Sequence, residues 1–245
     1  ETWSLAKIVN ETFGQYQLSL EDSDKSKTTS IELFEEVINN GNTIGRRYRP
    51  TLYDFLAHRA IDFSSGEEAS VTQPAYAFLL DKEEYFSEAP VFSTLDIMTR
   101  DTMSMKYFSL TLLQDVIAFH LTDKDPEALV DVDLKRLAFV KANHTSTIKD
   151  TLYLKALAKL EQNVISHPVS TRVTWHKAYL IGGSVYKPLL SDAHKWDLKK
   201  AFEICEEAKR RFKDSEGAIQ CENLQDNIMA RTINAVIEEN NLPNQ

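Results

Sequence analysis

The sequence predicts an almost all-helical protein built from antiparallel helical hairpins. Three observations predict this class. Seven glycines and seven prolines are few for 245 residues, apolar residues recur three and four positions apart along most of the chain, and strong helix formers such as Leu, Ala, Glu and Lys are abundant. A chain of this length can bury a large core without disulfides or metals.

Three helices are expected near the start of the chain. Apolar residues at helical spacing predict the first over residues 3–21, and a polar run then ends it. Ser30 is placed to cap a short second helix, whose inner face would carry Leu33 and Val37. The third covers residues 50–64 and has a proline in its first turn, where a missing N–H is tolerated.

Residues 64–101 interrupt this pattern. They contain two prolines and five scattered aromatic residues, which are Tyr76, Phe78, Tyr85, Phe86 and Phe92. Long loops without structure are uncommon in compact domains, so we expect an ordered connector whose aromatic rings dock onto neighbouring helices.

Six further helices are expected after the connector, over residues 102–121, 126–143, 147–166, 170–187, 195–212 and 216–233. Compact turns at Pro168 and at Lys213 each join two amphipathic helices that contain small residues. This layout resembles the tetratricopeptide repeat, although the closing proline of that repeat stands at only one of the two turns. We therefore expect a divergent tetratricopeptide-like array, whose stacked hairpins would leave a groove for partners.

We divide the chain into residues 1–101, residues 102–235 and a frayed tail at 236–245, with the first two parts forming one continuous module. A net charge of −9 argues against a nucleic-acid surface, and the basic stretch 46–49 is too short to reverse that expectation. No run of eighteen apolar residues is present, so no membrane-spanning segment is expected. The expected partners are proteins.

The sequence predicts no enzyme, no cofactor and no metal site. Its six histidines are not paired at the short spacings of zinc ligands, and neither a nucleophile elbow nor a phosphate-binding glycine loop occurs. Asp131 and Asp133 have the spacing of a solvated helix face. Catalysis would require carboxylates or histidines that converge from distant helices, which a sequence pattern does not reveal.

Cys205 and Cys221 form a candidate disulfide pair. They lie about equally far from the turn near Lys213, so antiparallel helices joined there would bring them to the same height. A disulfide needs a Cα separation of roughly 4.4–6.8 Å. Two buried, unbridged thiols remain the alternative.

The segment from Arg49 to Phe63 resembles a signature in the N-terminal helical region of very large bacterial alpha-2-macroglobulin-like proteins. The signature residues are Arg49, Pro50, Tyr53, Asp54, Phe55, His58 and Arg59. Agreement extends to residues 118–126, 150–157 and 196–201. Within the segment we expect Phe55 and its apolar neighbours to be core residues, and the polar signature residues to tie the helix to its surroundings.

The resemblance implies a module that precedes the β-sandwich domains of an extracytoplasmic protease trap or envelope-defence factor. Its partners would be other domains of the same polypeptide or another envelope protein. It would be periplasmic or at the cell surface, with any signal peptide or lipid anchor outside these 245 residues. The reactive thioester of that family lies elsewhere in its chains, so no catalytic residue is carried over.

A second hypothesis is a helical surface lipoprotein that captures carbohydrates or peptides. Trp3, Trp175 and Trp196 would then be stacking platforms in an aromatic groove. Specific binding of a sugar or peptide would favour this hypothesis, whereas an apolar docking patch would favour the interaction module.

Overall fold

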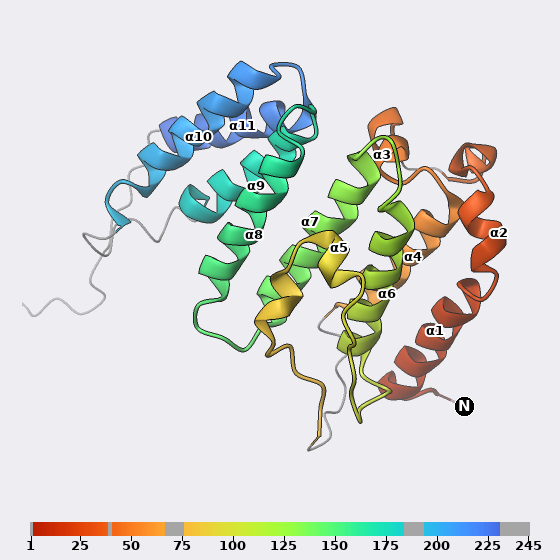
Figure 1. Cartoon of the computed structure of the whole chain (residues 1–245). Coiled ribbons are helices and arrows are strands. Elements are labelled where there is room, and N and C mark those ends of the chain that lie inside the picture. Colours follow the sequence, from red (N-terminus) through yellow and green to blue (C-terminus); the bar gives the residue numbers. More distant parts are fainter. Residues whose placement is uncertain (1, 39–40, 67–75, 184–193, 231–245) are drawn as a thin grey trace, which may run out of the picture.

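The computed structural model describes residues 2–38, 41–66, 76–183 and 194–230, and every regular element among them is helical (Figure 1). The predicted all-α class is therefore confirmed. The arrangement as tetratricopeptide-like repeats stays a prediction. No helix within these ranges is long and apolar enough to cross a bilayer. The predicted tail, the ends of two predicted helices and part of the connector lie outside the described residues.

The helices follow one another across the molecule roughly in sequence order (Figure 1). The first part contains α1 (Leu5–Ser19), α2 (Ser23–Thr28), η1 (Ile31–Phe34), α3 (Thr43–Tyr48) and α4 (Leu52–Ser64). The connector forms η3 (Glu83–Phe86) and α5 (Ala89–Phe92). Then come α6 (Met105–His120), α7 (Glu127–Asn143), α8 (Lys149–Asn163), α9 (Ser170–Gly182), α10 (Asp197–Arg211) and α11 (Glu216–Met229).

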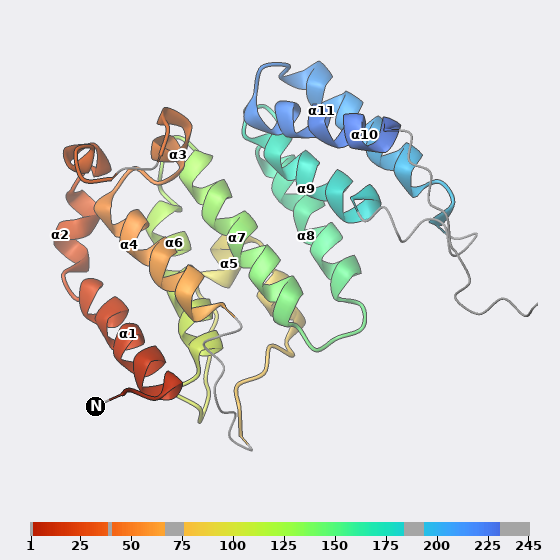
Figure 2. The same cartoon turned by 180° about the vertical axis from the view of Figure 1, so that it is seen from behind.

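Helix α7 lies between the N-terminal helices and the C-terminal hairpins (Figures 1 and 2). A large hydrophobic core runs from Tyr48 to Val173 and draws on α4, α6, α7, α8 and the connector. Because this core crosses residue 101, the two predicted parts of the chain share one interior. A smaller core of short side chains joins α9, α10 and α11.

The smaller core depends on a close approach of its helices. A Cβ atom placed on Gly182 would lie 2.5 Å from the Cβ of Ala201, and one placed on Gly217 would lie 2.2 Å from the backbone of α9. Any larger residue at either position would push the helices apart. The two glycines therefore set how closely α10 and α11 pack on α9.

The connector is ordered by a buried arginine on α7. Arg136 donates to the carbonyl oxygen of Tyr85 over 2.6 Å and to the carboxylate of Asp133 over 2.6 Å, and its guanidinium lies 4.5 Å from the ring centre of Phe92. Four of the five connector aromatics are buried, and only Tyr76 is exposed. The predicted docking of this segment is confirmed for these residues.

The third helix was expected to begin at residue 50, but it begins at Leu52, with Thr51 as its N-cap. Thr51 accepts a hydrogen bond from the Asp54 N–H, while the Asp54 side chain accepts one from the Thr51 N–H, which forms a capping box. Pro50 thus precedes the cap instead of standing in the first turn. Ahead of it, the six-residue helices α2 and α3 were not expected at all.

The expected inner face of the second helix is also wrong. Ser30 does accept from a backbone N–H, that of Glu32, but the helix it starts is a single 3₁₀ turn. A tighter turn changes which residues point inward. Ile31 is buried instead, while Leu33 is 77% exposed and Val37 is 72% exposed.

Phe55 is not the core residue that its apolar side chain suggests. Tyr53, Ala57, Ala60 and Ile61 form the buried face of α4, whereas Phe55 is only partly buried and lies 5.4 Å from the guanidinium of Arg59. The inner face thus combines Tyr53, Ile61 and two alanines with polar residues that find partners.

We predict that Ile61→Ala lowers the free energy of unfolding by about 2–5 kcal/mol, because it leaves a cavity in a closed core. Phe55→Ala should cost less than about 2 kcal/mol, since only part of the ring leaves water on folding. Urea denaturation of both variants measures the difference. A larger loss for Phe55→Ala than for Ile61→Ala would contradict this assignment of the core.

Candidate functional site

Two polar residues of the 49–63 signature, Asp54 and His58, lie in the interior, whereas Arg49 is partly exposed and Arg59 is exposed. Asp54 is 0% exposed and His58 is 2% exposed. The Nε2 atom of His120 on α6 lies 2.7 Å from Asp54, and its Nδ1 atom lies 2.7 Å from Asp123. Burial lowers the pKa of His120, but the two carboxylates outweigh it and hold the pKa above its ordinary value.

A second buried carboxylate joins three parts of the chain. Asp131 on α7 accepts from Arg49 over 3.1 Å and from Arg172 of α9 over 2.8 Å. Burial raises the pKa of Asp131, yet the two guanidinium groups bring it below its ordinary value. Arg172 also lies 4.1 Å from the ring centre of Tyr48, whose hydroxyl donates to Glu216 of α11 over 2.6 Å. The predicted solvated face at Asp131 and Asp133 is therefore wrong.

Two further histidines in this region are held neutral. Burial, aided by the positive charges of Arg49 and Lys135, lowers the pKa of His58 well below its ordinary value. Burial and the nearby Arg172 lower the pKa of His176 to about 4. Both rings are therefore uncharged at neutral pH, with His58 buried and His176 partly buried.

The network connects several helices through its buried hydrogen bonds and ion pairs. Its carboxylates are filled by hydrogen-bond donors, and the hydroxyl of Tyr153 lies 3.3 Å from Nδ1 of His176. The signature residues Asp54, His58 and Arg49 thus serve as structural ties in this arrangement. Tyr53 adds a hydrogen bond from its hydroxyl to Asp115.

Three potential metal ligands meet at two turns. Ligand atoms of Asp125, Glu127 and His167 lie within 4.8 Å of one another. However, the Nδ1 atom of His167 accepts from the Val169 N–H over 3.3 Å, which places the ring proton on Nε2, the atom that faces Asp125 at 3.9 Å. Glu127 is already paired with Arg47 at 3.4 Å. These residues fit a charge cluster better than a metal centre.

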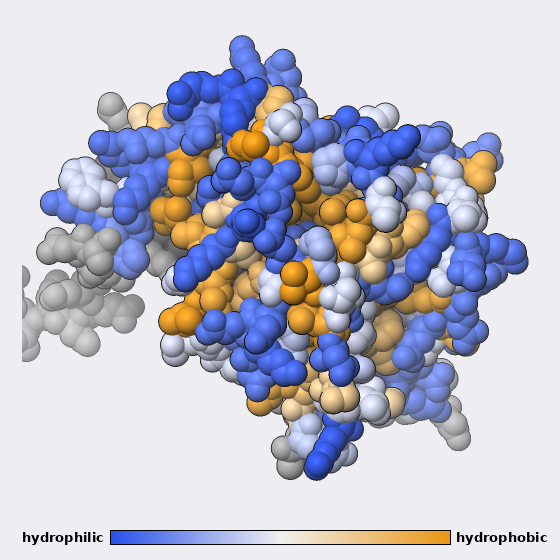
Figure 3. Space-filling model, in the orientation of Figure 1, coloured by the Kyte–Doolittle hydropathy of each residue, from blue (hydrophilic) through white to orange (hydrophobic). Residues whose placement is uncertain are grey.

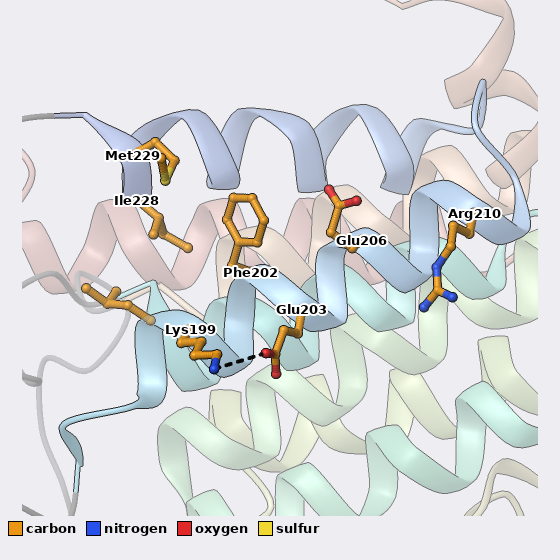
Figure 4. Close-up of a pocket in the computed structure, with 8 residues that line it drawn as sticks. Lys199, Phe202, Glu203, Glu206, Arg210, Ile228 and Met229 are labelled. Atoms are coloured by element: carbon orange, nitrogen blue, oxygen red, sulfur yellow. Dashed lines mark ion pairs between the residues drawn. The ribbon is translucent and has the colours of Figure 1, made fainter.

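An apolar groove lies between α10 and α11 (Figure 4). Its volume is about 670 Å³, and its lining residues are Leu198, Lys199, Phe202, Glu203, Glu206, Arg210, Ile228 and Met229. Phe202 and Ile228 point toward one another across the space between the two helices, and the charged residues stand along α10. An apolar floor with a charged rim is the composition of a protein-docking site.

A second groove, of about 500 Å³, separates the connector from α8. Pro90 and Val91 form one wall, while Leu152 and Ala156 belong to the other. Apolar patches interrupted by charged side chains are visible on the face that carries α5, α8 and α9 (Figure 3). This groove lies beside the contacts through which the connector packs on the helices.

The three tryptophans do not form a common platform. Trp3 precedes α1, which lies at the opposite end of the molecule from α10 (Figure 1), and the ammonium of Lys7 lies 4.6 Å from its ring centre. Trp175 is partly buried and stacks on Tyr179 with 5.2 Å between the ring centres. Trp196 is exposed just before α10. A single aromatic groove therefore cannot include both Trp3 and Trp196.

The two cysteines come together as the sequence suggested. Cys205 and Cys221 are both fully buried in the core between α9, α10 and α11, and both are free thiols.

Comparison with known proteins does not identify a family. No protein-family model matches the chain, and neither a curated protein nor a solved structure is similar to it.

We predict a stability that falls on acidification through His176. In the unfolded chain this ring titrates near its ordinary pKa of 6.5, whereas the folded ring titrates at about 4. Between these values the unfolded state binds more protons. The free energy of unfolding therefore decreases by up to about 1.4 kcal/mol for each unit by which the pH is lowered. His58 acts in the same direction. His120 acts oppositely, since its raised pKa stabilises the fold below pH 6.5 and that contribution is lost as the pH rises.

Urea denaturation of the wild type and of His176→Gln at pH 7, 6 and 5 measures this effect. The variant should lose less stability than the wild type over this interval. Stability curves that run parallel in the two proteins would show that His176 does not take part.

Proposed function

We propose that this chain is a non-catalytic interaction and spacer module at the N-terminal side of a bacterial alpha-2-macroglobulin-like envelope protein. It would act in the periplasm or at the cell surface, as part of a protease-trap or defence system. The groove between α10 and α11 carries the proposal, and the signature at residues 49–63 suggests the parent protein. The occupant of the groove would be another domain of the same polypeptide.

The position of the groove supports a docking role. Helices in a stacked array bury one face on each neighbour. Helix α10 packs on α9 through Ala201, Cys205 and Ala208, while Phe202 belongs to the groove side. The apolar groove therefore lies on the part of the terminal hairpin that α9 does not cover.

The buried network supports the spacer role. Arg49, Asp131 and Arg172 connect α7 to the N-terminal helices and to α9, and Arg136 fixes the connector to α7. Paired arginines such as Arg136 and Arg172, which are largely shielded from water, hold one geometry. In such a rigid module, the position of one end would determine the position of the other.

Capture of a sugar or peptide is the alternative. It is favoured by one observation, the 59% exposure of Trp196 beside Lys199, whose ammonium lies 5.9 Å from the ring centre. Lys199 also lines the groove. Under this alternative Trp196→Ala abolishes binding of an oligosaccharide or peptide panel, whereas under the docking proposal the panel does not bind.

The complete reading frame gives the first test, because macroglobulin-like β-domains should follow this module. The segment encoding them, produced separately, should bind the wild-type chain in isothermal titration calorimetry. Phe202→Glu should weaken binding at least about tenfold, since it places a charge at the centre of an apolar contact.

Leu33→Glu is the matched control, because Leu33 is a large exposed apolar residue of η1, outside the groove. It should bind as the wild type does. Circular dichroism and urea denaturation establish that both variants are folded. A reading frame without β-domains, or equal affinity of the wild type and Phe202→Glu, would refute the proposal.

A further inference from the structure

The small core of the terminal hairpin contains two thiols among alkyl side chains. Cys205 on α10 and Cys221 on α11 are both 0% exposed, and the other buried members of this cluster are Ala178, Ala201, Ala208 and Leu224. Each thiol shifts the pKa of the other across the contact between the two helices. Each thiol thus has the other as its polar neighbour within this core.

The register of the two helices places the cysteines at the same height. Both stand eight positions from Lys213, one before it and one after it. One helical turn beyond Cys221, the side chain of Gln225 donates to the carbonyl oxygen of Phe202 over 3.0 Å and to Glu206 over 2.8 Å. These bonds hold α11 against the stretch of α10 that contains Cys205.

The small residues also bring the two backbones close. Helices that pack through short side chains approach to about 8 Å between their axes, and each Cα lies about 2.3 Å from its axis. For axial separations of about 8–10 Å, facing Cα atoms therefore lie roughly 3.4–5.4 Å apart, a range that overlaps the separation that a disulfide requires. This close packing favours a bond between the two sulfurs.

We propose that Cys205 and Cys221 form an intramolecular disulfide in oxidising surroundings and so close the terminal hairpin covalently. The oxidant is a small disulfide such as oxidised glutathione. The Cys205 thiolate attacks one of its sulfurs, a mixed disulfide forms and one glutathione thiolate leaves. The Cys221 thiolate then attacks the Cys205 sulfur and releases the second glutathione. Each cysteine loses one proton and one electron, and the glutathione disulfide is reduced to two thiols.

The assignment of Cys205 as the first nucleophile follows from its surroundings. The contact with Cys221 and the nearby Lys209 ammonium lower the pKa of the Cys205 thiol, while the same contact and burial raise the pKa of Cys221. The thiolate is the attacking species. Helix α11 packs on α9 and α10 at one end of the array (Figure 1), so opening of this hairpin gives the oxidant access.

The bond would also fix the docking groove. Phe202 lies one turn before Cys205, and Ile228 lies two turns after Cys221, so a covalent tie between α10 and α11 holds the two walls of the groove at one spacing. Preorganised grooves bind with a smaller loss of conformational entropy. The inference goes beyond the proposed function, and its test involves no binding partner.

The test is incubation of the folded chain with oxidised and reduced glutathione, followed by intact-mass measurement and by titration of free thiols with a maleimide in guanidinium. We expect a mass lower by two hydrogen atoms and no free thiol. The midpoint of thermal unfolding should rise by about 6–12 °C for closure of this short loop. Reduction with dithiothreitol should reverse both changes.

The melting temperatures of Cys205→Ala and of Cys221→Ala should no longer depend on the redox conditions. Two variants are used so that a folding defect in one of them does not decide the result. Persistence of two free thiols at equilibrium, a stable glutathione adduct on either cysteine, or a disulfide between two chains would each overturn the proposal.

Discussion

The fold depends on one shared carboxylate, that of Asp131 in the middle of α7. Arg49 reaches it from the end of α3 and Arg172 reaches it from α9. A buried charge without partners would cost several kcal/mol, whereas a paired one is retained and fixes geometry. Because its two partners come from opposite sides of α7, Asp131 determines how the N-terminal helices and the C-terminal hairpins are placed relative to each other.

Similar ties continue along the molecule. Glu161 of α8 accepts from Lys177 over 2.5 Å and from Arg211 over 2.6 Å, which links α8 to α9 and α10. The Asp133–Arg136 pair holds the connector. Each of these carboxylates, with its cationic partners, connects segments that could slide past each other across a purely apolar interface. These ties favour one fixed arrangement of the helices, which supports the proposed spacer role.

The sequence predicts long helices well, because apolar spacing over more than ten residues leaves few alternatives. It fails for α2 and α3, which are six residues long and mostly polar. It also fails where burial is decided by distant partners. Asp131 has the pattern of a solvated residue until arginines from two other helices are in place, and the groove at Phe202 exists only once α11 is placed beside α10.

If Asp131 fixes this arrangement, its ion pairs should make the N-terminal helices and the C-terminal hairpins unfold together. In a Trp3→Phe background, fluorescence comes from Trp175 and Trp196 alone and so reports α9 and the start of α10, while far-ultraviolet circular dichroism reports all helices. Their urea transitions should coincide when Asp131 is present. In Asp131→Ala the fluorescence transition should come first, at lower urea. Coincident transitions with an unchanged midpoint in Asp131→Ala would contradict the account.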